Sequence, residues 1–519
     1  MGTDAVKQKR SRGPGGRILL VLGLLAVLVY LFNKLVLDGC ADSYDDTAMH
    51  FKYGSIGSDN LRRGIPYRIW QILPEMFPQH LPHLPQCQSL TYEAFGLTMD
   101  PKDRVDRPIG FSKRWRFGAG EFIGINCAFC HVSTVRATPD GPTRIILGMP
   151  ANTVDAEAFF RFLFAAADDP DFTTENVLKH IEQKGRLGYW EKFIHRYLLI
   201  PAFQDGAKSM KHKFGFLDRR PTPFGPGRVD TWAYYKVEKL QDSLQIFEKL
   251  PAFGAPTLEM DPGALSGIAD FPALWREKLP QGALHWDGNN RSPQERNITA
   301  ALGAGATPAT LDLRAVTRIA TWFEADDYAI ESYHSMVPGP KTDPLLAEKL
   351  VAKGLALFTT HCHKCHGRDG AQTSGIVGIK DIGTDQARLD AFSEALSDKL
   401  NEVHHLAAWR LENYWKTNGY ANLLLTGIWL RAPYLHNGSV PTLWHLLQDP
   451  SKRPVEFCRG NNLYDWDHVG FQWDPGADDC SGSFKYDTRL PGNGNGGHVY
   501  GTNLPDQDKR ALMEYLKTL

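Results

Sequence analysis

The 519-residue sequence has almost no net charge and few cysteines. Its net charge is −1 with a pI near 7.0, so it lacks the basic excess with which proteins bind nucleic acid. The glycine-rich run at residues 494–497 lacks the Gly-Lys-Ser/Thr ending of a phosphate-binding loop, which excludes a nucleotide site of that type. Hydrophobic residues make up 42% and charged residues 23%, a balance typical of a globular chain.

The few cysteines also lack the spacing of a structural zinc site or a thioredoxin-like site. Two pairs have the form Cys-x-x-Cys, at residues 127–130 and 362–365. A structural zinc site needs a second close pair nearby, and a redox dithiol of the thioredoxin type follows a strand in a βαβ unit. Neither pattern is present, so the pairs require another interpretation.

A histidine follows each cysteine pair directly, which makes both segments haem-attachment patterns. In Cys-x-x-Cys-His the two thiols bond to the porphyrin edge and the histidine is an axial ligand of the iron. Two intervening residues make about one helical turn and bring both sulfurs to one side. The sequence therefore predicts two covalently bound haem c groups, with Cys127, Cys130, Cys362 and Cys365 as attachment sites and His131 and His366 as iron ligands.

The N-terminus has the pattern of a membrane anchor. An apolar run extends from Ile18 to Phe32 and, past Asn33 and Lys34, to Leu37, which is just long enough to cross a bilayer. Cleavage of a signal peptide or lipidation at Cys40 are the alternatives to a retained anchor. Basic residues ahead of the run predict a cytoplasmic tail and export of the rest of the chain: Lys7, Lys9, Arg10, Arg12 and Arg17.

We thus expect a single-pass protein of the bacterial inner membrane with its main domain in the periplasm. Four cysteines remain outside the haem motifs, and in an oxidising compartment an even number favours disulfides. Cys458 and Cys480 are suited to closing the loop between them. Whether Cys40 pairs with Cys87 stays open.

Hydrophobic periodicity predicts a mainly α fold with long loops. Residues 41–120 are rich in proline and aromatics and are expected to form loops and short helices. Helices are expected over about 155–167, about 313–333, from Pro344 to the second motif, and after Pro505. We therefore predict two cytochrome c-like haem domains behind a transmembrane helix: residues 1–40 as basic tail and anchor, 41–337 as the haem domain with the reaction site, and 338–519 as the domain with the electron-transfer haem.

With these motifs in order, the chain resembles the bacterial dihaem cytochrome c peroxidase and MauG superfamily, and most of all its rubber oxygenase (RoxA-like) branch. The resemblance covers about residues 120–519. It depends on the two haem motifs, on Leu-His-Trp-Asp-Gly at 284–288, and on Ala-Pro-Tyr-Leu-His-Asn-Gly-Ser at 432–439. Gly-Gly-His at 496–498 before the last helix supports it further.

The resemblance implies roles for two kinds of residue near the first haem. Trp286 would lie between the haems and pass electrons. Peroxidase members also have a downstream glutamate that moves protons over the open haem face. Counted without gaps, that place holds Gly303-Ala304-Gly305-Ala306 here, although a gap in the count would bring in Glu295. A missing acid and an apolar lining favour O2 chemistry on an apolar substrate.

The second haem would take its distal ligand from His498, with His436 as the rival. Two imidazoles would close that haem and make it an electron-transfer centre. We therefore expect a dihaem oxidoreductase that uses O2 or peroxide on an apolar small molecule or a redox protein partner. Oxygenase is the favoured activity. A peroxidase or MauG-like oxidase and a non-catalytic electron carrier are the alternatives.

Overall fold

A computed structural model gives the fold of most of the chain. It describes residues 14–32, 40–61, 63–82, 91–116, 118–236, 267–275, 282–284, 286–325, 328–338, 344–405, 408–474, 480 and 483–519. Helices account for 43% of the structure and strands for 13%, so the expected mainly α fold contains more sheet than predicted. The basic residues from Lys7 to Arg12, as well as Cys87 and His285, lie outside the described residues.

The prediction of an N-terminal transmembrane helix is wrong. Within the described residues, no helix has both the length and the apolar content needed to cross a bilayer. Helix α1 (Pro14–Phe32) begins with Pro-Gly-Gly-Arg, so its apolar part starts only at Ile18. That part rises about 22 Å at 1.5 Å per residue, which falls short of the roughly 30 Å hydrocarbon core of a membrane. The predicted single-pass location in the inner membrane, with the main domain in the periplasm, is overturned with it.

The segment before the first haem motif contains a sheet where loops and short helices were expected. Three antiparallel strands have the order β1–β3–β2, with β1 at Ile65–Pro66, β2 at Phe111–Arg116 and β3 at Gly120–Ile125. Phe111 pairs with Ile125 and is buried, as is Phe122. Phe111 and Phe122 lie on opposite faces of the sheet, because Phe122 is three residues from Ile125, the partner of Phe111. Phe111 packs in a hydrophobic cluster with residues of several helices, and Phe122 packs with Ile194 and Leu199.

Those helices form the layer beneath the sheet. The main ones are α3 (Tyr67–Met76), α5 (Ala156–Asp168), α6 (Thr174–Lys184) and α8 (Ile200–Lys213). Asp155 caps α5 by accepting a hydrogen bond from the backbone NH of Ala158, as expected for an acidic residue at a helix start. Phe159 and Leu163 on α5 are buried, which confirms the predicted apolar face.

The next predicted helix is shorter than expected. Helix α12 (Leu313–Glu324) starts behind its capping residue Asp312 and ends where Ala325 turns to extended backbone, with φ −63° and ψ 136°. The predicted stretch to Tyr333 therefore breaks, and a separate short helix α13 (Tyr333–Met336) follows.

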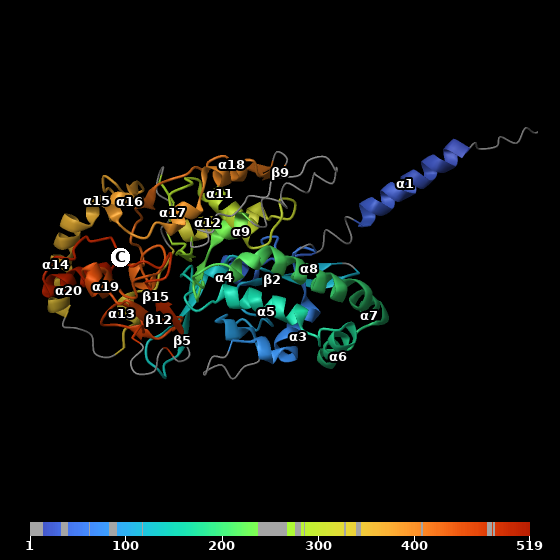
Figure 1. Cartoon of the computed structure of the whole chain (residues 1–519), viewed down its shortest axis with the longest axis horizontal. Coiled ribbons are helices and arrows are strands. Elements are labelled where there is room, and N and C mark those ends of the chain that lie inside the picture. Colours follow the sequence, from blue (N-terminus) through green and yellow to red (C-terminus); the bar gives the residue numbers. More distant parts are fainter. Residues whose placement is uncertain are drawn as a thin grey trace, which may run out of the picture.

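The C-terminal half is framed by two helices in close contact. Helix α14 (Pro344–His361) begins at the predicted proline and runs into the second haem motif, and α20 (Asp506–Leu516) closes the chain as predicted. Figure 1 shows α14 and α20 side by side at one end of the molecule, with α7 (Tyr189–Ile194) at the other. A side chain at Gly354 would meet the carbonyl oxygen of Ala511, so glycine permits this approach.

One hydrophobic cluster joins the two halves. It contains Phe51 and Phe323 from the first half and Phe358, Trp429 and Leu512 from the second, all buried. The boundary between 337 and 338 stays a prediction, and any domains on either side of it share this core.

A disulfide joins Cys458 and Cys480, as the sequence led us to expect. It closes the connection between β12 (Glu456–Arg459) and β15 (Phe484–Asp487), which pair antiparallel. Cys40 is a free, exposed thiol.

Candidate functional site

The first Cys-x-x-Cys-His motif is fixed at the start of a short helix. Helix α4 (Ala128–His131) follows β3 and leads directly into β4 (Val132–Arg136). Asn126 anchors it, because its side-chain oxygen accepts from the Ala128 NH while its amide donates to the carbonyls of Lys52 and Gly54. The motif is thereby tied to α2 (Thr47–Tyr53).

The imidazole of His131 is oriented by one hydrogen bond. Its Nδ1 lies 2.8 Å from the carbonyl oxygen of Pro272, which only accepts, so Nδ1 carries the hydrogen. The other ring nitrogen, Nε2, therefore keeps a lone pair. Burial lowers the pKa of His131 to about 4, so the ring is neutral at neutral pH. A neutral imidazole whose far nitrogen is held by a backbone carbonyl is the form that ligates metals.

The second motif repeats this arrangement 235 residues later. His366 ends the short helix α15 (His363–His366), and its Nδ1 donates to the carbonyl oxygen of Leu423 at 2.7 Å. Burial also lowers the pKa of His366. Two motifs in different surroundings thus present the same neutral imidazole with Nε2 left for a metal.

The cysteines of both motifs fit covalent haem attachment. All four are free thiols, so neither pair is closed as a disulfide. Burial raises the pKa of Cys127 to about 12 and that of Cys362 to about 11, so both are protonated thiols at neutral pH. Free thiols beside a metal-ready imidazole are the residues that a c-type haem requires.

Trp286 is hydrogen-bonded into the backbone between the two motifs. Its indole Nε1 donates to the carbonyl oxygen of Asp270 at 2.9 Å, two residues before Pro272, the acceptor of His131. Its own carbonyl accepts from the NH of Ala421 at 2.9 Å, two residues before Leu423, the acceptor of His366. Two short backbone segments thus connect the predicted tryptophan to both histidines.

The Trp-Asp-Gly segment is held in place by a buried ion pair. Asp287 lies 2.7 Å from the Nε of Arg388, and both side chains are almost fully buried. The hydroxyl of Thr417 donates to the carbonyl of Asp287 at 2.5 Å. Since removing one member of such a pair would leave a buried charge unpaired, the segment is rigid.

His498 faces His366. Their ring centres lie 6.3 Å apart, and the Nδ1 of His498 is buried without a hydrogen-bond partner among the described residues. Two imidazoles on opposite sides of one metal ion have ring centres about 6 Å apart when each metal–nitrogen bond is about 2 Å. Burial lowers the pKa of His498 to about 3. The pair fits the two axial positions of one iron.

The loop that carries His498 has strained backbone. His498 has a φ of +47°, which is uncommon for a residue with a side chain. The preceding Gly497 has a φ of +70° and lies so close to Gly383 that any Cβ would clash. The NH of His498 donates to the carbonyl of Ile382 at 2.8 Å.

Arg453, which the sequence alone did not single out, holds this loop. Its Nη1 donates to the carbonyls of Asn495 and Gly497 at 2.6 and 2.9 Å, and its Nη2 to those of Leu446 and His498 at 3.3 and 3.2 Å. The arginine is buried, and burial lowers its pKa to about 10. No local pattern marks it, because the loop it holds lies about 45 residues further along the chain.

The rival histidine, His436, is engaged elsewhere. It is stacked on Tyr420 with ring centres 4.1 Å apart, and its Nε2 lies 2.9 Å from the Tyr420 hydroxyl. That hydroxyl donates its only hydrogen to the carbonyl of Asp385 at 2.6 Å, so the imidazole must donate to the phenol. Nε2 of His436 then has no lone pair for a metal.

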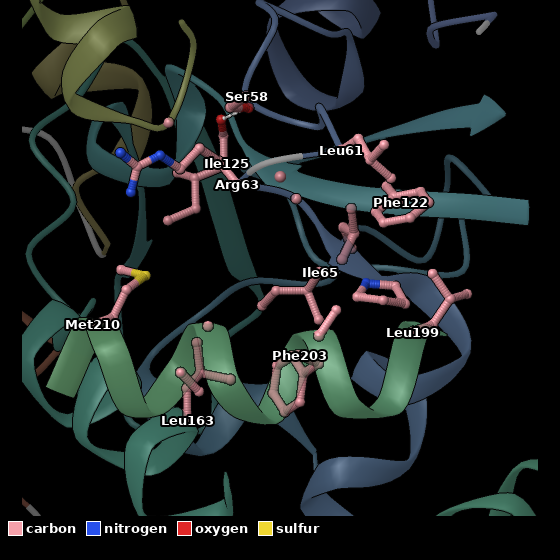
Figure 2. A pocket seen from close by; sticks show the side chains of 18 of the residues that line it. Ser58, Leu61, Arg63, Ile65, Phe122, Ile125, Leu163, Leu199, Phe203 and Met210 are labelled. Atoms are coloured by element: carbon pink, nitrogen blue, oxygen red, sulfur yellow. Dashed lines mark hydrogen bonds between the residues drawn. The ribbon is translucent and has the colours of Figure 1, made fainter. Parts of the chain in front are cut away.

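A large apolar cavity lies beside the first motif (Figure 2). It has a volume of about 820 Å³, within the range of small-molecule pockets. Phe122 and Ile125 from β3 face Leu163 of α5 and Phe203 of α8 across it. Ile125 lies two residues before the first haem cysteine, and the lining residue Phe159 contacts Phe129 of the motif with ring centres 5.8 Å apart. The cavity is therefore separated from the haem motif by one layer of side chains.

The run Gly303-Ala304-Gly305-Ala306 lines this cavity, where a peroxidase would have its glutamate by resemblance. Among the described lining residues none is Asp or Glu, and the charged ones are Arg63 and Lys213. Glu295 is buried outside the cavity and accepts hydrogen bonds from Asn290, Glu412 and Asn413. Because these N–H groups donate to its carboxylate, Glu295 has a structural role.

The cavity as a whole was not predicted from the sequence. Its walls include residues of β1, the β2–β3 turn, β3, α5, α7 with the helical turn that follows it, α8 and the segment 303–308, which are distant in sequence. Phe159 of α5 belongs to the hydrophobic core and also lines the cavity.

Comparison with known proteins agrees with the haem motifs. Residues 419–458 match the model of the family described as RoxA-like, cytochrome c-like. This segment contains Leu423, the hydrogen-bond acceptor of His366. The resemblance to the wider peroxidase and MauG superfamily stays a prediction.

Two proteins of Sinorhizobium fredii (strain NBRC 101917 / NGR234) are similar to this chain. Uncharacterized protein y4iM is 29% identical over 295 residues, which cover 48% of this chain and 64% of y4iM. Uncharacterized protein y4iJ is 32% identical over 487 residues, which cover 76% of this chain and 77% of y4iJ. The chain therefore belongs to the family of y4iJ, and its RoxA-like segment identifies it as a c-type cytochrome with covalently bound haem c.

Proposed function

We propose that this c-type cytochrome carries two haems and oxidises an apolar substrate with O2. Cys127 and Cys130 would hold the first haem, with His131 on its iron. Cys362 and Cys365 would hold the second, with His366 on its iron. When bound, the haems supply an iron centre for O2 chemistry and a store for electrons.

The observation that carries this proposal is the apolar cavity beside the first motif. The cavity, with a volume of about 820 Å³, is enclosed mainly by aromatic and aliphatic side chains from segments that are distant in sequence. Such walls bind an apolar molecule, exclude water and orient the bound molecule toward the haem motif, to which Ile125 leads. The residues of the chain would therefore bind the substrate, orient it and exclude water from it.

The absence of an acid in the described lining favours oxygenase over peroxidase chemistry. Cleavage of peroxide gains from a group that moves a proton at the open haem face. The lining at Gly303–Ala306 offers only small apolar residues, and Glu295 is committed to backbone and side-chain amides.

The second motif would serve as the electron store. His498 opposite His366 would close both axial positions, which suits electron transfer rather than substrate chemistry. Trp286 would carry electrons between the two centres, because it is hydrogen-bonded to Asp270 and Ala421, each two residues before the acceptor of one motif histidine. An oxidisable indole on that route shortens each electron step.

The test is O2 uptake by the haem-loaded protein with an apolar alkene, compared with the matching alkane. Catalase is added to remove peroxide. We expect uptake with the alkene and loss of it in a His131→Ala variant. Gly206→Leu should also abolish uptake, since Gly206 lines the cavity and an added side chain meets nothing within 4 Å.

Gly215→Leu is the matched control, because Gly215 has equally open space and is not among the described lining residues. It should leave O2 uptake unchanged. Turnover that requires added peroxide would contradict the oxygenase proposal and favour a peroxidase. No turnover under either condition, with both haems low-spin, would favour an electron carrier.

A further inference from the structure

An unusual group of aromatic side chains is exposed at one end of the molecule. It lies on α7 and on the following π-helix η4 (His195–Leu199). Trp190 is 59% exposed, Phe193 50% and Tyr197 61%. Proteins rarely expose several large apolar side chains together unless the surface has a function.

These three rings form a continuous row, here called the aromatic ladder. The ring centres of Trp190 and Phe193 lie 5.7 Å apart and nearly parallel, and those of Phe193 and Tyr197 lie 5.0 Å apart. Ring contacts at these distances stabilise one another. The ladder is therefore an ordered strip of apolar surface.

The ladder leads into the cavity. Trp190 and Leu198 are exposed at the surface and also line the cavity, together with the buried Leu199. The indole of Trp190 donates to the carbonyl of Gly118 at 3.0 Å, and Gly118 in the β2–β3 turn lines the cavity as well. The mouth thus lies between α7–η4 and this turn.

The π-helix has a role in this geometry. A π-turn inserts one extra residue into a helix and is found frequently at functional sites. Here it lies between α7 and α8 and contains Tyr197 of the ladder as well as Leu198 and Leu199 of the cavity wall. One segment therefore supplies both the outer strip and the inner wall.

The charges around the ladder are paired. Lys192 lies 2.8 Å from Glu182, and Arg196 pairs with Glu175. Since each cation is balanced by a neighbouring carboxylate, this rim has no excess charge that would attract an ionic ligand. A neutral apolar ligand suits both the rim and the ladder.

We propose that the aromatic ladder is an outer subsite for a linear, uncharged apolar chain that is longer than the cavity. One end of the chain enters between α7–η4 and the β2–β3 turn, and the remainder lies along Trp190, Phe193 and Tyr197. The inference rests on the proposed function, because the chain bound here is the substrate held in the cavity. A single row of rings that continues into an apolar cavity matches an extended chain better than a compact molecule.

The test measures binding rather than turnover. Haem-loaded protein is titrated calorimetrically with straight-chain primary alcohols from octanol upward. Burial of each added methylene should tighten binding about fourfold, even for chains too long for the cavity. Phe193→Ala and Tyr197→Ala should bind the shorter alcohols normally and lose the further gain for the longer ones. Trp190→Ala also removes part of the cavity wall, so it should weaken binding of the shorter alcohols as well as lose the gain for the longer ones.

Tyr189→Ala is the matched control. Tyr189 is 95% exposed on the same helix and is not among the described cavity-lining residues or ring contacts. It should bind every alcohol like the wild type. Trp190→Phe keeps a ring without the Gly118 hydrogen bond and should retain most of the gain for long chains.

Three outcomes would overturn the proposal. If the ladder variants bind long alcohols as tightly as the wild type, the ladder is not a subsite, while the cavity and the proposed function stand. If Gly206→Phe, which adds a ring at the cavity wall, leaves binding of all alcohols unchanged, the proposed function itself fails. If ladder variants lose only co-sedimentation with phosphatidylcholine vesicles, the surface docks on lipid instead.

Discussion

At the residue scale, the two haem motifs differ in their surroundings. His366 has His498 opposite it with ring centres 6.3 Å apart, whereas the strand that leads into the first motif lines an apolar cavity. Both histidines donate through Nδ1 to a backbone carbonyl, so each keeps Nε2 for iron. A difference in function between the two haems would therefore depend on the residues that lie across each iron from its motif histidine.

Substitution of His498 should open the second centre. We expect His498→Ala to convert a low-spin ferric signal to high-spin and to allow cyanide to bind there. His436→Ala is the comparison and should leave the spin state unchanged, because Nε2 of His436 donates to Tyr420. Electron paramagnetic resonance of the oxidised protein measures both. A spin change in the His436 variant alone would reverse the assignment.

Arg453 should act as a positioning residue for His498. Arg453→Met removes four hydrogen bonds to carbonyls, including that of His498, and should lower the free energy of unfolding by roughly 2–4 kcal/mol. It should also loosen the ligand, seen as faster cyanide binding and a partial high-spin signal. Arg453→Lys keeps the charge and should show an intermediate effect. An unchanged spectrum in both variants would leave Arg453 a purely structural group.

A pH effect is expected from His445, which is distant from the motif residues in sequence. Burial lowers its pKa from 6.5 to about 4. Below about pH 6.5, His445 is protonated in the unfolded chain but stays neutral in the folded chain. Stability is therefore lost as the pH falls from about 6.5 to about 4. The loss should reach about 3 kcal/mol, from about 1.4 kcal/mol per pKa unit. Urea unfolding of His445→Gln should show a correspondingly weaker pH dependence.

At the element scale, the contact between α14 and α20 depends on one glycine. A Cβ at Gly354 would lie 2.1 Å from the carbonyl oxygen of Ala511. Gly354→Ala should therefore destabilise the protein by about 1–3 kcal/mol through overpacking, although alanine is the better helix former. Gly206→Ala in α8 is the control, because its Cβ meets nothing, and it should stabilise by up to about 1 kcal/mol. Thermal or urea unfolding measures both, and equal effects at the two positions would contradict this explanation.

The elements with local signals were predictable from the sequence. Helices α5, α14 and α20 follow apolar periodicity, an acidic cap at Asp155 or a proline at the first turn. The sheet β1–β3–β2 was missed, because β1 has two residues and pairs with a strand more than fifty positions away. Long-range pairing leaves little trace in a local pattern.

The N-terminal helix was mispredicted for a related reason. The apolar run was counted to Leu37 across Asn33 and Lys34, whereas the described residues of α1 are Pro14–Phe32. Composition over a window does not reveal where a helix ends, and that length decides whether a span is long enough. The anchor and the location inferred from it fail together.

At the scale of the whole molecule, the haem motifs were predictable and their surroundings were not. Cys-x-x-Cys-His specifies its chemistry within five residues, so the sequence alone predicts four thiols and two histidines as haem-binding residues. Three features form only when the chain folds: the cavity, the approach of His498 to His366, and the hydrogen bonds of Trp286 to the backbone. They depend on segments separated by tens to hundreds of residues.

The arrangement of the whole molecule separates two tasks. The β1–β3–β2 sheet with α5, α7 and α8 surrounds the apolar cavity beside the first motif. The α14–α20 half holds the second motif and the His498 loop (Figure 1). A shared hydrophobic cluster keeps the two parts in fixed contact. Such a frame would keep the distance between the two centres constant during turnover.

The central claim is that one chain holds two irons, one closed and one open. Quantitative electron paramagnetic resonance of the oxidised, fully matured protein tests it most directly. We predict two ferric signals of equal amount per chain, one low-spin from the His366–His498 centre and one high-spin from the His131 centre. A single ferric iron per chain, or two low-spin signals, would contradict the claim.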